Sequence, residues 1–178
     1  MAEVSSSENE TTALKSWKLS EKGFELQIVQ RLPDQTRGFF LARGFNKSQA
    51  NDIATQCIMQ TIVKNTSKQE EAIISVKLRE WRVKTAAQVR GVKLKEDWAE
   101  QWSNLAKGET AVKPSAKIAF RWATFPSEQQ FDVKGDYNWG MISFGLKPGA
   151  NFDLQVFWQV GEKRFSQWIR GIDCPEDK

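Results

Sequence analysis

The sequence contains no histidine, and this absence narrows the chemistry that the chain can perform. Histidine is the commonest general base, the commonest protein ligand of metals and the usual pH switch near neutrality. The chain also lacks the nucleophile elbow of serine hydrolases, a glycine-rich phosphate loop, a CxxC pair and the HExxH motif of zinc proteases. These absences disfavour an enzyme and favour a binding or accessory protein.

Long apolar runs and basic clusters are also absent. No stretch approaches the roughly 18–20 apolar residues needed to span a bilayer, so no transmembrane segment is expected. The formal net charge is +4, and Lys and Arg are interspersed with acids, so nucleic acid is not an expected partner. We expect residues 19–178 to form one globular domain and the polar residues 1–18 to be a disordered N-terminal tail.

Only two cysteines are present, Cys57 and Cys174. Cys174 lies close to the C-terminus in a polar segment that would otherwise fray, and a disulfide to Cys57 would hold it on the core. The polar, serine-rich start resembles a mature N-terminus from which a leader has been removed. Because disulfides persist in oxidising compartments, we expect a periplasmic or secreted location. Two independent thiols in a cytosolic protein are the alternative.

The hydrophobic pattern predicts helices in the first two thirds of the chain. Pro33 is typical of a first helical turn and Gly44 of a helix end, and a second apolar face follows Asn46, so two short helices are expected within residues 33–55. Leucines and tryptophans spaced by three and four predict an amphipathic helix over residues 94–106.

Alternation of apolar and polar residues predicts strands elsewhere. It runs through residues 20–32, 56–64 and 73–83, and strands separated by Gly and Pro turns follow from residue 117 to the end. Residues 117–122 are the first of these later strands. The prediction is therefore an α+β fold: an antiparallel β-sandwich with two short N-terminal helices and one inserted amphipathic helix.

Two segments resemble immunoglobulin-like sandwiches of extracytoplasmic proteins. Residues 59–67 (MQTIVKNTS), followed by a return strand that ends in Trp81, look like the opening hairpin of such folds. The turn at residues 146–149 (LKPG) and the strand at residues 152–156 (FDLQV) are similar to their later strands. The resemblance implies a fold class and a compartment, and it implies no activity.

Aromatic residues form the first candidate site. Tyr137 and Trp139 alternate with acid and amide side chains and precede a glycine that would let a ligand approach the backbone. Phe157 interrupts the polar face of its predicted strand. Such aromatic platforms bind sugars or anchor protein partners. We expect a non-catalytic accessory protein that recognises a protein partner, a glycan or another small ligand through these three rings. Membership of the core is the competing interpretation of each ring.

A copper(I)-handling accessory protein is the second possibility. Cys57 and Met59 would share one face of a strand, and Met141 would add a third sulfur. Soft sulfur ligands without imidazole select copper(I). A disulfide at Cys57 would remove the only thiolate from this site.

A hydrolase, for example one acting on carbohydrates, is the third possibility. Asp132, Asp136 and Asp153 lie in the strand-rich half of the chain. Glycoside hydrolysis commonly uses a pair of carboxylates, although these three are also ordinary turn residues.

Overall fold

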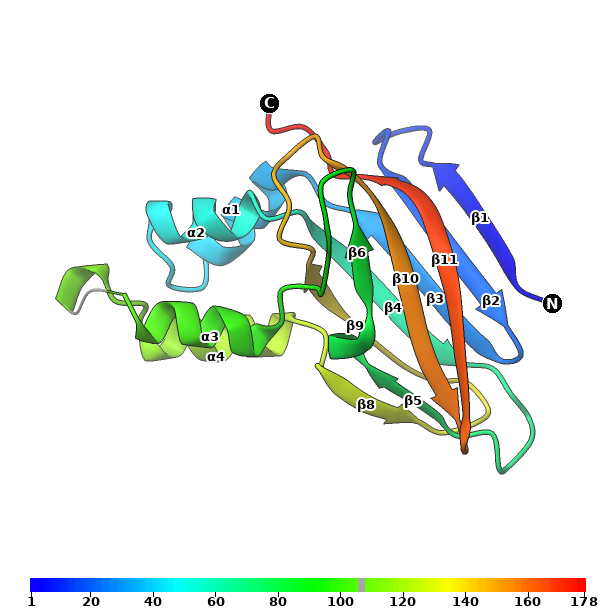
Figure 1. The fold of residues 1–178 in the computed structure, drawn as a ribbon. Coiled ribbons are helices and arrows are strands. Elements are labelled where there is room, and N and C mark those ends of the chain that lie inside the picture. The colour runs from blue at the N-terminus through cyan, green and yellow to red at the C-terminus, as the bar shows by residue number, and fades with distance from the viewer. Residues whose placement is uncertain (106–107) are drawn as a thin grey trace.

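The computed structural model describes residues 1–105 and 108–178, and shows two antiparallel sheets packed against each other with helices at one end (Figure 1). The strands are β1 (Glu3–Glu8), β2 (Lys15–Glu21), β3 (Phe24–Gln30), β4 (Ile58–Asn65), β5 (Ile74–Lys77), β6 (Arg82–Lys84), β7 (Val89–Arg90), β8 (Glu128–Phe131), β9 (Asp136–Ser143), β10 (Asn151–Val160) and β11 (Lys163–Asp173). The helices are α1 (Pro33–Leu41), α2 (Lys47–Ala54), α3 (Lys95–Ser103) and α4 (Pro114–Ala123), with 3-10 turns η1 (Leu78–Glu80) and η2 (Gly108–Thr110).

Sheet A has the order β1-β2-β3-β4-β9, so four consecutive strands form a meander and β9 adds the last edge. In sheet B the long strand β10 is central. It pairs with β11 on one side and with both β5 and β6 on the other, and these lead to the edge strands β8 and β7. The predicted α+β fold built on antiparallel sheets is confirmed.

Sheet A has a hydrophobic core on each face. The sandwich core lies between the two sheets and includes Met59 and Trp158, both almost fully buried. The helical core lies between sheet A and the helices and includes Ile58, Met141 and Phe120. Because neighbouring side chains of a strand point to opposite faces, β4 and β9 supply residues to both cores.

A buried amide supports the connection from sheet A to sheet B. Asn65, at the end of β4, is 0% exposed. Its Nδ2 donates to the carbonyls of Ala72 at 2.8 Å and Phe131 at 3.0 Å, and its Oδ1 accepts from the Ser67 N–H at 3.0 Å. The asparagine thus satisfies backbone groups where the chain crosses between the sheets, as buried polar groups require.

The tail expected to be disordered over residues 1–18 contains β1 and the start of β2 instead. β1 pairs with β2 from Glu3↔Ser20 to Glu8↔Lys15. Trp17 of β2, which is 4% exposed, anchors the hairpin to the sandwich core. All six residues of β1 are exposed, so this strand lacks the apolar alternation from which strands are predicted.

Residues 117–122, expected to form a strand, belong to helix α4 instead. Pro114 occupies the first turn, where its fixed φ suits a helix. Ala116 and Phe120 are buried in the helical core, a spacing of four that belongs to a helix. The sequence also alternates through Ile118 and Trp122, which explains the wrong prediction. The short helices expected in residues 33–55 correspond to α1 and α2, and the one expected over 94–106 contains α3; residue 106 lies outside the described residues.

The predicted disulfide joins Cys57, just before β4, to Cys174, just after β11, with Cα atoms 5.5 Å apart. Both cysteines are buried in the sandwich core. The Cys174 N–H also donates to the Ala150 carbonyl at 2.8 Å, and Gln30 Nε2 donates to the Asp173 carbonyl at 2.7 Å. The C-terminal segment is therefore held by one covalent bond and several hydrogen bonds. Among the described residues, no helix combines the length and the apolar character needed to cross a membrane.

Candidate functional site

The structure places the three predicted aromatic residues on opposite sheets. Tyr137 and Trp139 lie on β9 of sheet A, whereas Phe157 lies on β10 of sheet B. Val156 and Trp158 point into the sandwich core, so Phe157 between them lies on the outer face of sheet B. Tyr137 and Trp139 are thus brought together, and Phe157 is not part of their surface.

Tyr137 and Trp139 are 59% and 60% exposed on the outer face of sheet A. They occupy alternate positions of β9 and lie opposite Lys64 and Ile62 of β4. Met141 is the next residue on the same face, and it is only 5% exposed because it belongs to the helical core. The exposed aromatic rings therefore stand where the cover of helices ends.

Helix α4 adds two exposed apolar side chains that sequence reasoning missed. Ile118 is 52% exposed and Trp122 is 85% exposed, and their spacing of four places them on one face of the helix. They were missed because residues 117–122 were assigned to a strand. The signal that could have shown them was Pro114 followed by buried Ala116 and Phe120 at helical spacing.

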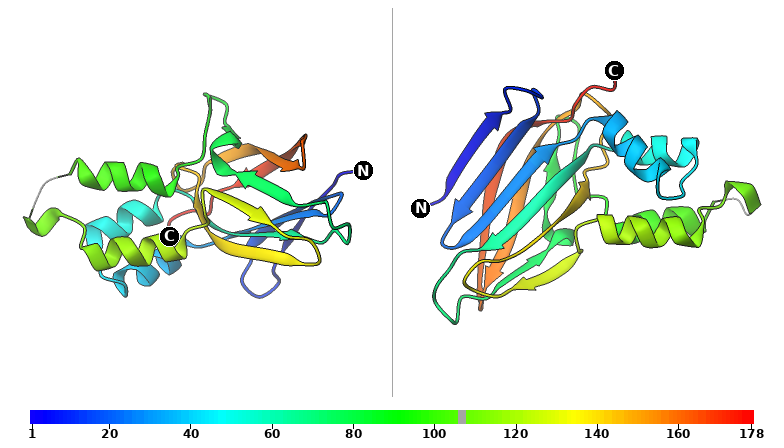
Figure 2. Two further views of the ribbon diagram at one scale, coloured as in Figure 1. Left: turned by 90° about the horizontal axis from the view of Figure 1, so that it is seen from below. Right: turned by 180° about the vertical axis from the view of Figure 1, so that it is seen from behind.

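The chain leaves α4 directly beside β9. Thr124 forms a parallel bridge with Met141, and the Phe125 N–H donates to the Met141 carbonyl at 2.9 Å. Figure 2 shows α4 running toward this edge of sheet A. Trp122 lies two residues before Thr124, and Trp139 lies two residues before Met141. We name Ile118, Trp122, Tyr137 and Trp139 together the β9–α4 surface.

Gly140 lies against the backbone of a neighbouring segment. The expectation that this glycine would let a ligand approach the strand is therefore wrong. A Cβ atom at Gly140 would lie 2.5 Å from the backbone nitrogen of Phe125, closer than any real contact. The glycine therefore permits the close approach of the segment that follows α4. This contact fixes the end of α4 relative to β9.

Cations cover the aromatic rings on the outer face of sheet B. Arg164 lies 4.7 Å from the ring centroid of half-buried Phe157. Trp168 has Arg170 at 4.7 Å and Lys84 at 5.9 Å from its ring. These cation–π contacts occupy ring faces that a ligand would need for stacking. Phe157 is accordingly a weaker candidate for recognition than the rings of the β9–α4 surface.

The three sulfur atoms of the copper hypothesis do not converge. Cys57 is bonded to Cys174, Met59 is buried in the sandwich core, and Met141 is buried in the helical core on the other face of sheet A. In the described part of the chain, no group of three or more Cys, Asp or Glu side chains is placed to hold a metal ion.

The three aspartates of the hydrolase hypothesis are divided between two places. Asp136 accepts from the Asp132 N–H at 2.8 Å, which stabilises the turn between β8 and β9. Asp153 lies on sheet B, where it pairs with Arg170 at 3.2 Å and accepts from the Gly171 N–H at 2.9 Å. Asp136 and Asp153 therefore each have a local structural role, and they do not form a pair.

Comparison of the chain with protein-family models, with curated proteins and with solved structures found no match. Its function must therefore be argued from its own residues and geometry.

Proposed function

We propose that this chain is a non-catalytic extracytoplasmic binding protein whose partner, another protein, docks on the β9–α4 surface. The observation that carries the proposal is the exposure of three large aromatic side chains: 85% for Trp122, 60% for Trp139 and 59% for Tyr137. Trp and Tyr are enriched among the residues that dominate interface energies. Fully burying one large apolar side chain contributes roughly 1.5–3 kcal/mol, so covering this surface would contribute substantially to binding.

The shape of the surface favours a protein over a small ligand or a glycan. It combines the outer face of a strand with the outward face of a helix, and none of its four residues lines the best-formed hollows among the described residues. A small ligand normally needs a concave site that surrounds most of its area, whereas a protein can cover a flat one.

Charge indicates the character of the expected partner. Helix α4 carries Lys117 and Arg121 and no acidic residue. Lys64 lies opposite Tyr137 at the other margin of the surface. A partner with an apolar centre and an acidic rim would complement this arrangement.

Two further features support the compartment. The disulfide between Cys57 and Cys174 is typical of proteins that fold under oxidising conditions. The likeness to extracytoplasmic immunoglobulin-like sandwiches is supported by the two packed antiparallel sheets alone, because the hairpin expected after residues 59–67 does not form: β4 lies in sheet A and the return strand β5 in sheet B. The meander of β1 to β4 departs from the Greek-key connections usual in that fold, so the likeness extends to the architecture alone.

The docking surface can be tested by photocrosslinking in the source cells. A photoreactive residue at Trp122 or Trp139 should give one discrete adduct, whose second protein is identified by mass. The same residue at exposed Ser5 of β1 or Gln159 of β10 is the matched control and should not give that adduct. With the purified partner, Trp139→Ala should weaken binding by about 30-fold and Gln159→Ala should not. Equal adducts at all four positions, or none at Trp122 and Trp139, would overturn the proposal.

The compartment is tested separately by the thiol state of protein taken from the same cells. Alkylation under denaturing conditions should add no group before reduction and two groups after it. Alkylation of both cysteines without reduction would place the protein in a reducing compartment.

A further inference from the structure

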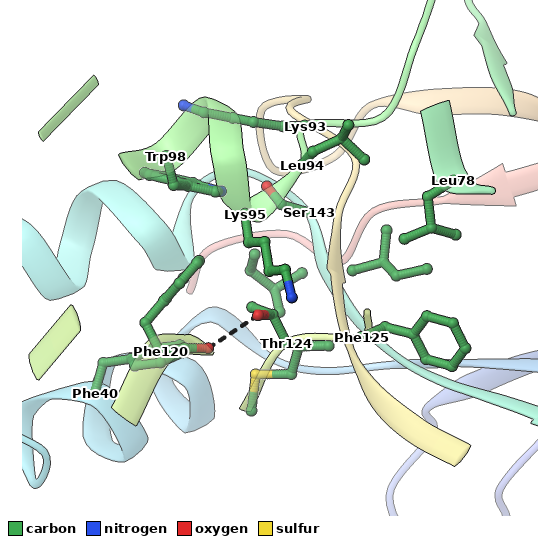
Figure 3. A pocket seen from close by; sticks show the side chains of 13 residues that line it. Phe40, Leu78, Lys93, Leu94, Lys95, Trp98, Phe120, Thr124, Phe125 and Ser143 are labelled. Carbon is green, nitrogen blue, oxygen red and sulfur yellow. Dashed lines mark hydrogen bonds between the residues drawn. The ribbon is translucent and has the colours of Figure 1, made fainter. Parts of the chain in front are cut away.

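A crevice between the helices and sheet A has inward-facing hydrogen-bond donors, and no acid is among the described residues that line it (Figure 3). Its walls are largely apolar and include Phe40, Phe120 and Met141. The charged residues among those that line it are Lys93 and Lys95, both cationic. The crevice itself is small, with a volume of about 10 Å³, which is room for about one water-sized group.

The indole N–H of Trp98 is the first of these donors. Trp98 is 0% exposed, and its Nε1 has no hydrogen-bond partner among the described residues. Figure 3 shows the nitrogen edge of the ring turned toward the middle of the crevice. Leaving a buried donor unsatisfied costs about 1–3 kcal/mol, so such groups usually face an acceptor.

Lys95 supplies the second donor. Figure 3 shows its amine extending into the crevice toward Thr124. The Thr124 hydroxyl donates its proton to the Phe120 carbonyl at 3.0 Å. Thr124 can therefore only accept hydrogen bonds from other groups, and it supplies no donor to the crevice. Among the described residues, no carboxylate forms an ion pair with Lys95.

A second lysine adds to the positive potential around Trp98. Lys93 Nζ lies 3.6 Å from the centroid of the Trp98 ring and donates to Gln101 Oε1 at 2.6 Å. Burial lowers the pKa of Lys93, and this effect exceeds the opposing attraction of nearby Asp52 and Asp97. Lys93 therefore places a cation over one face of this indole, with Asp52 and Asp97 close to that cation.

A groove between α3 and α4 borders the crevice. The groove has a volume of about 230 Å³, shares Lys95 and Phe120 with the crevice, and has Trp102 among its apolar lining. Glu96, the one acid among the described residues that line it, accepts a hydrogen bond from the Ser127 hydroxyl at 2.6 Å. Pockets for drug-sized ligands typically measure about 300–1,000 Å³, so this smaller groove matches a ligand of only a few carbon atoms.

We propose that this site binds a small carboxylic acid with an apolar tail. One carboxylate oxygen enters the crevice and accepts from the Trp98 indole N–H, while the Lys95 amine neutralises the charge. The tail lies in the groove along Trp102 and Phe120. A carboxylate accounts for more of these features than a lone water does, because one oxygen fills the water-sized crevice beside the indole N–H while its charge pairs with Lys95 and its tail meets Trp102 and Phe120. The groove is also lined by Lys117 and Arg121, which lie at the margin of the β9–α4 surface, but it includes none of the four apolar residues that define that surface.

The test uses hexanoate as probe and follows the Trp98 indole resonance by ¹⁵N–¹H NMR on the intact protein. Hexanoate should shift this resonance saturably and downfield, and the uncharged isostere hexanamide should not. Lys95→Met keeps the apolar stem but removes the amine, and should weaken hexanoate binding by about ten-fold or more. The exposed Lys163→Met is the matched control and should leave the affinity unchanged within about two-fold, since surface charges contribute little.

Three results would overturn the proposal. The Trp98 resonance does not respond to hexanoate, it responds equally to hexanamide, or Lys95→Met binds hexanoate as tightly as the wild type. The first would assign the indole N–H to a buried water, and the other two would show that the site does not recognise the carboxylate charge through Lys95. None of them bears on photocrosslinking at Trp122 and Trp139, so the two proposals fail independently.

Discussion

Removal of the disulfide should lower the free energy of unfolding by about 4–5 kcal/mol, because the closed loop is long. The bond joins residues separated by 117 positions. For a loop of about 100 residues, the loss of chain entropy in the unfolded state corresponds to about 4.7 kcal/mol. Since domains of this kind have a total stability of about 5–15 kcal/mol, the double variant Cys57→Ala/Cys174→Ala should be folded but much less stable.

The loss should arise mainly in the unfolded state. In the folded chain, the Cys174 N–H still donates to Ala150 at 2.8 Å, and Gln30 still donates to the Asp173 carbonyl at 2.7 Å. These contacts keep the C-terminal segment in place without the covalent bond. The unfolded chain, by contrast, expands when the cross-link is removed, so the dependence of stability on urea should become steeper.

Urea unfolding followed by tryptophan fluorescence measures both effects, since the chain has eight tryptophans. With a slope of about 2 kcal/mol per molar urea, the midpoint should fall by about 2 M in the double variant. The single variants Cys57→Ala and Cys174→Ala should each lose as much as the double variant, because either one breaks the bond. A loss below about 1 kcal/mol with an unchanged slope would refute the loop-entropy argument.

Three further perturbations test the fold. Asn65→Ala leaves two carbonyls and one N–H without their partner, and should cost about 2–4 kcal/mol in urea unfolding; a loss within experimental error would contradict the role given to this amide. Gly140→Ala forces a Cβ to within 2.5 Å of the Phe125 nitrogen and should cost about 1–3 kcal/mol. In Gly38→Ala the new methyl meets no described atom within 4 Å, so this control substitution in a helix should stabilise by about 0.5–1 kcal/mol; equal effects of the two glycine substitutions would be inconsistent with the close approach at Gly140. Burial lowers the pKa of Lys93 in the folded chain below its ordinary value of 10.5. Between the folded and the unfolded pKa, the unfolded chain therefore binds more protons than the folded chain. The free energy of unfolding of the wild type, relative to that of Lys93→Met, should rise as the pH rises through this window. Urea unfolding of both proteins at pH 7 and pH 10.5 measures this difference, and a relative loss by the wild type would reverse the assigned sign.

Several features could be predicted because short-range signals carry them. β10 alternates buried and half-buried or exposed residues through nearly all its length, which is the pattern of a strand with one face on a core. The position of Cys174 in a polar terminal segment predicted a disulfide, and Cys57 was its one possible partner because the chain has only two cysteines. In these cases the neighbours along the chain are enough to determine the outcome.

Other elements depend on contacts that the local sequence does not reveal. β1 has no buried residue and exists through its pairing with β2, which in turn is anchored by Trp17. Residues 117–122 satisfy both a period of two and a helical spacing, and the helical core around Phe120 decides between them. Tertiary packing therefore overrode an ambiguous local pattern in α4.

β9 shows why the candidate surface could be identified by residue type but not located from the sequence. Its last four residues, from Gly140 to Ser143, are all buried because each face of the strand is covered by a core. Its first four alternate, and Tyr137 and Trp139 lie on the same face as buried Met141. The change from burial to exposure along this one face occurs where the end of α4 meets the strand at the bridge between Thr124 and Met141. Without the position of α4, an aromatic residue at Trp139 is equally consistent with the helical core and with a binding surface. Since the same strand is packed on both sides at Met141, the backbone that carries the exposed rings is held in place, which lowers the backbone entropy lost when a partner binds them.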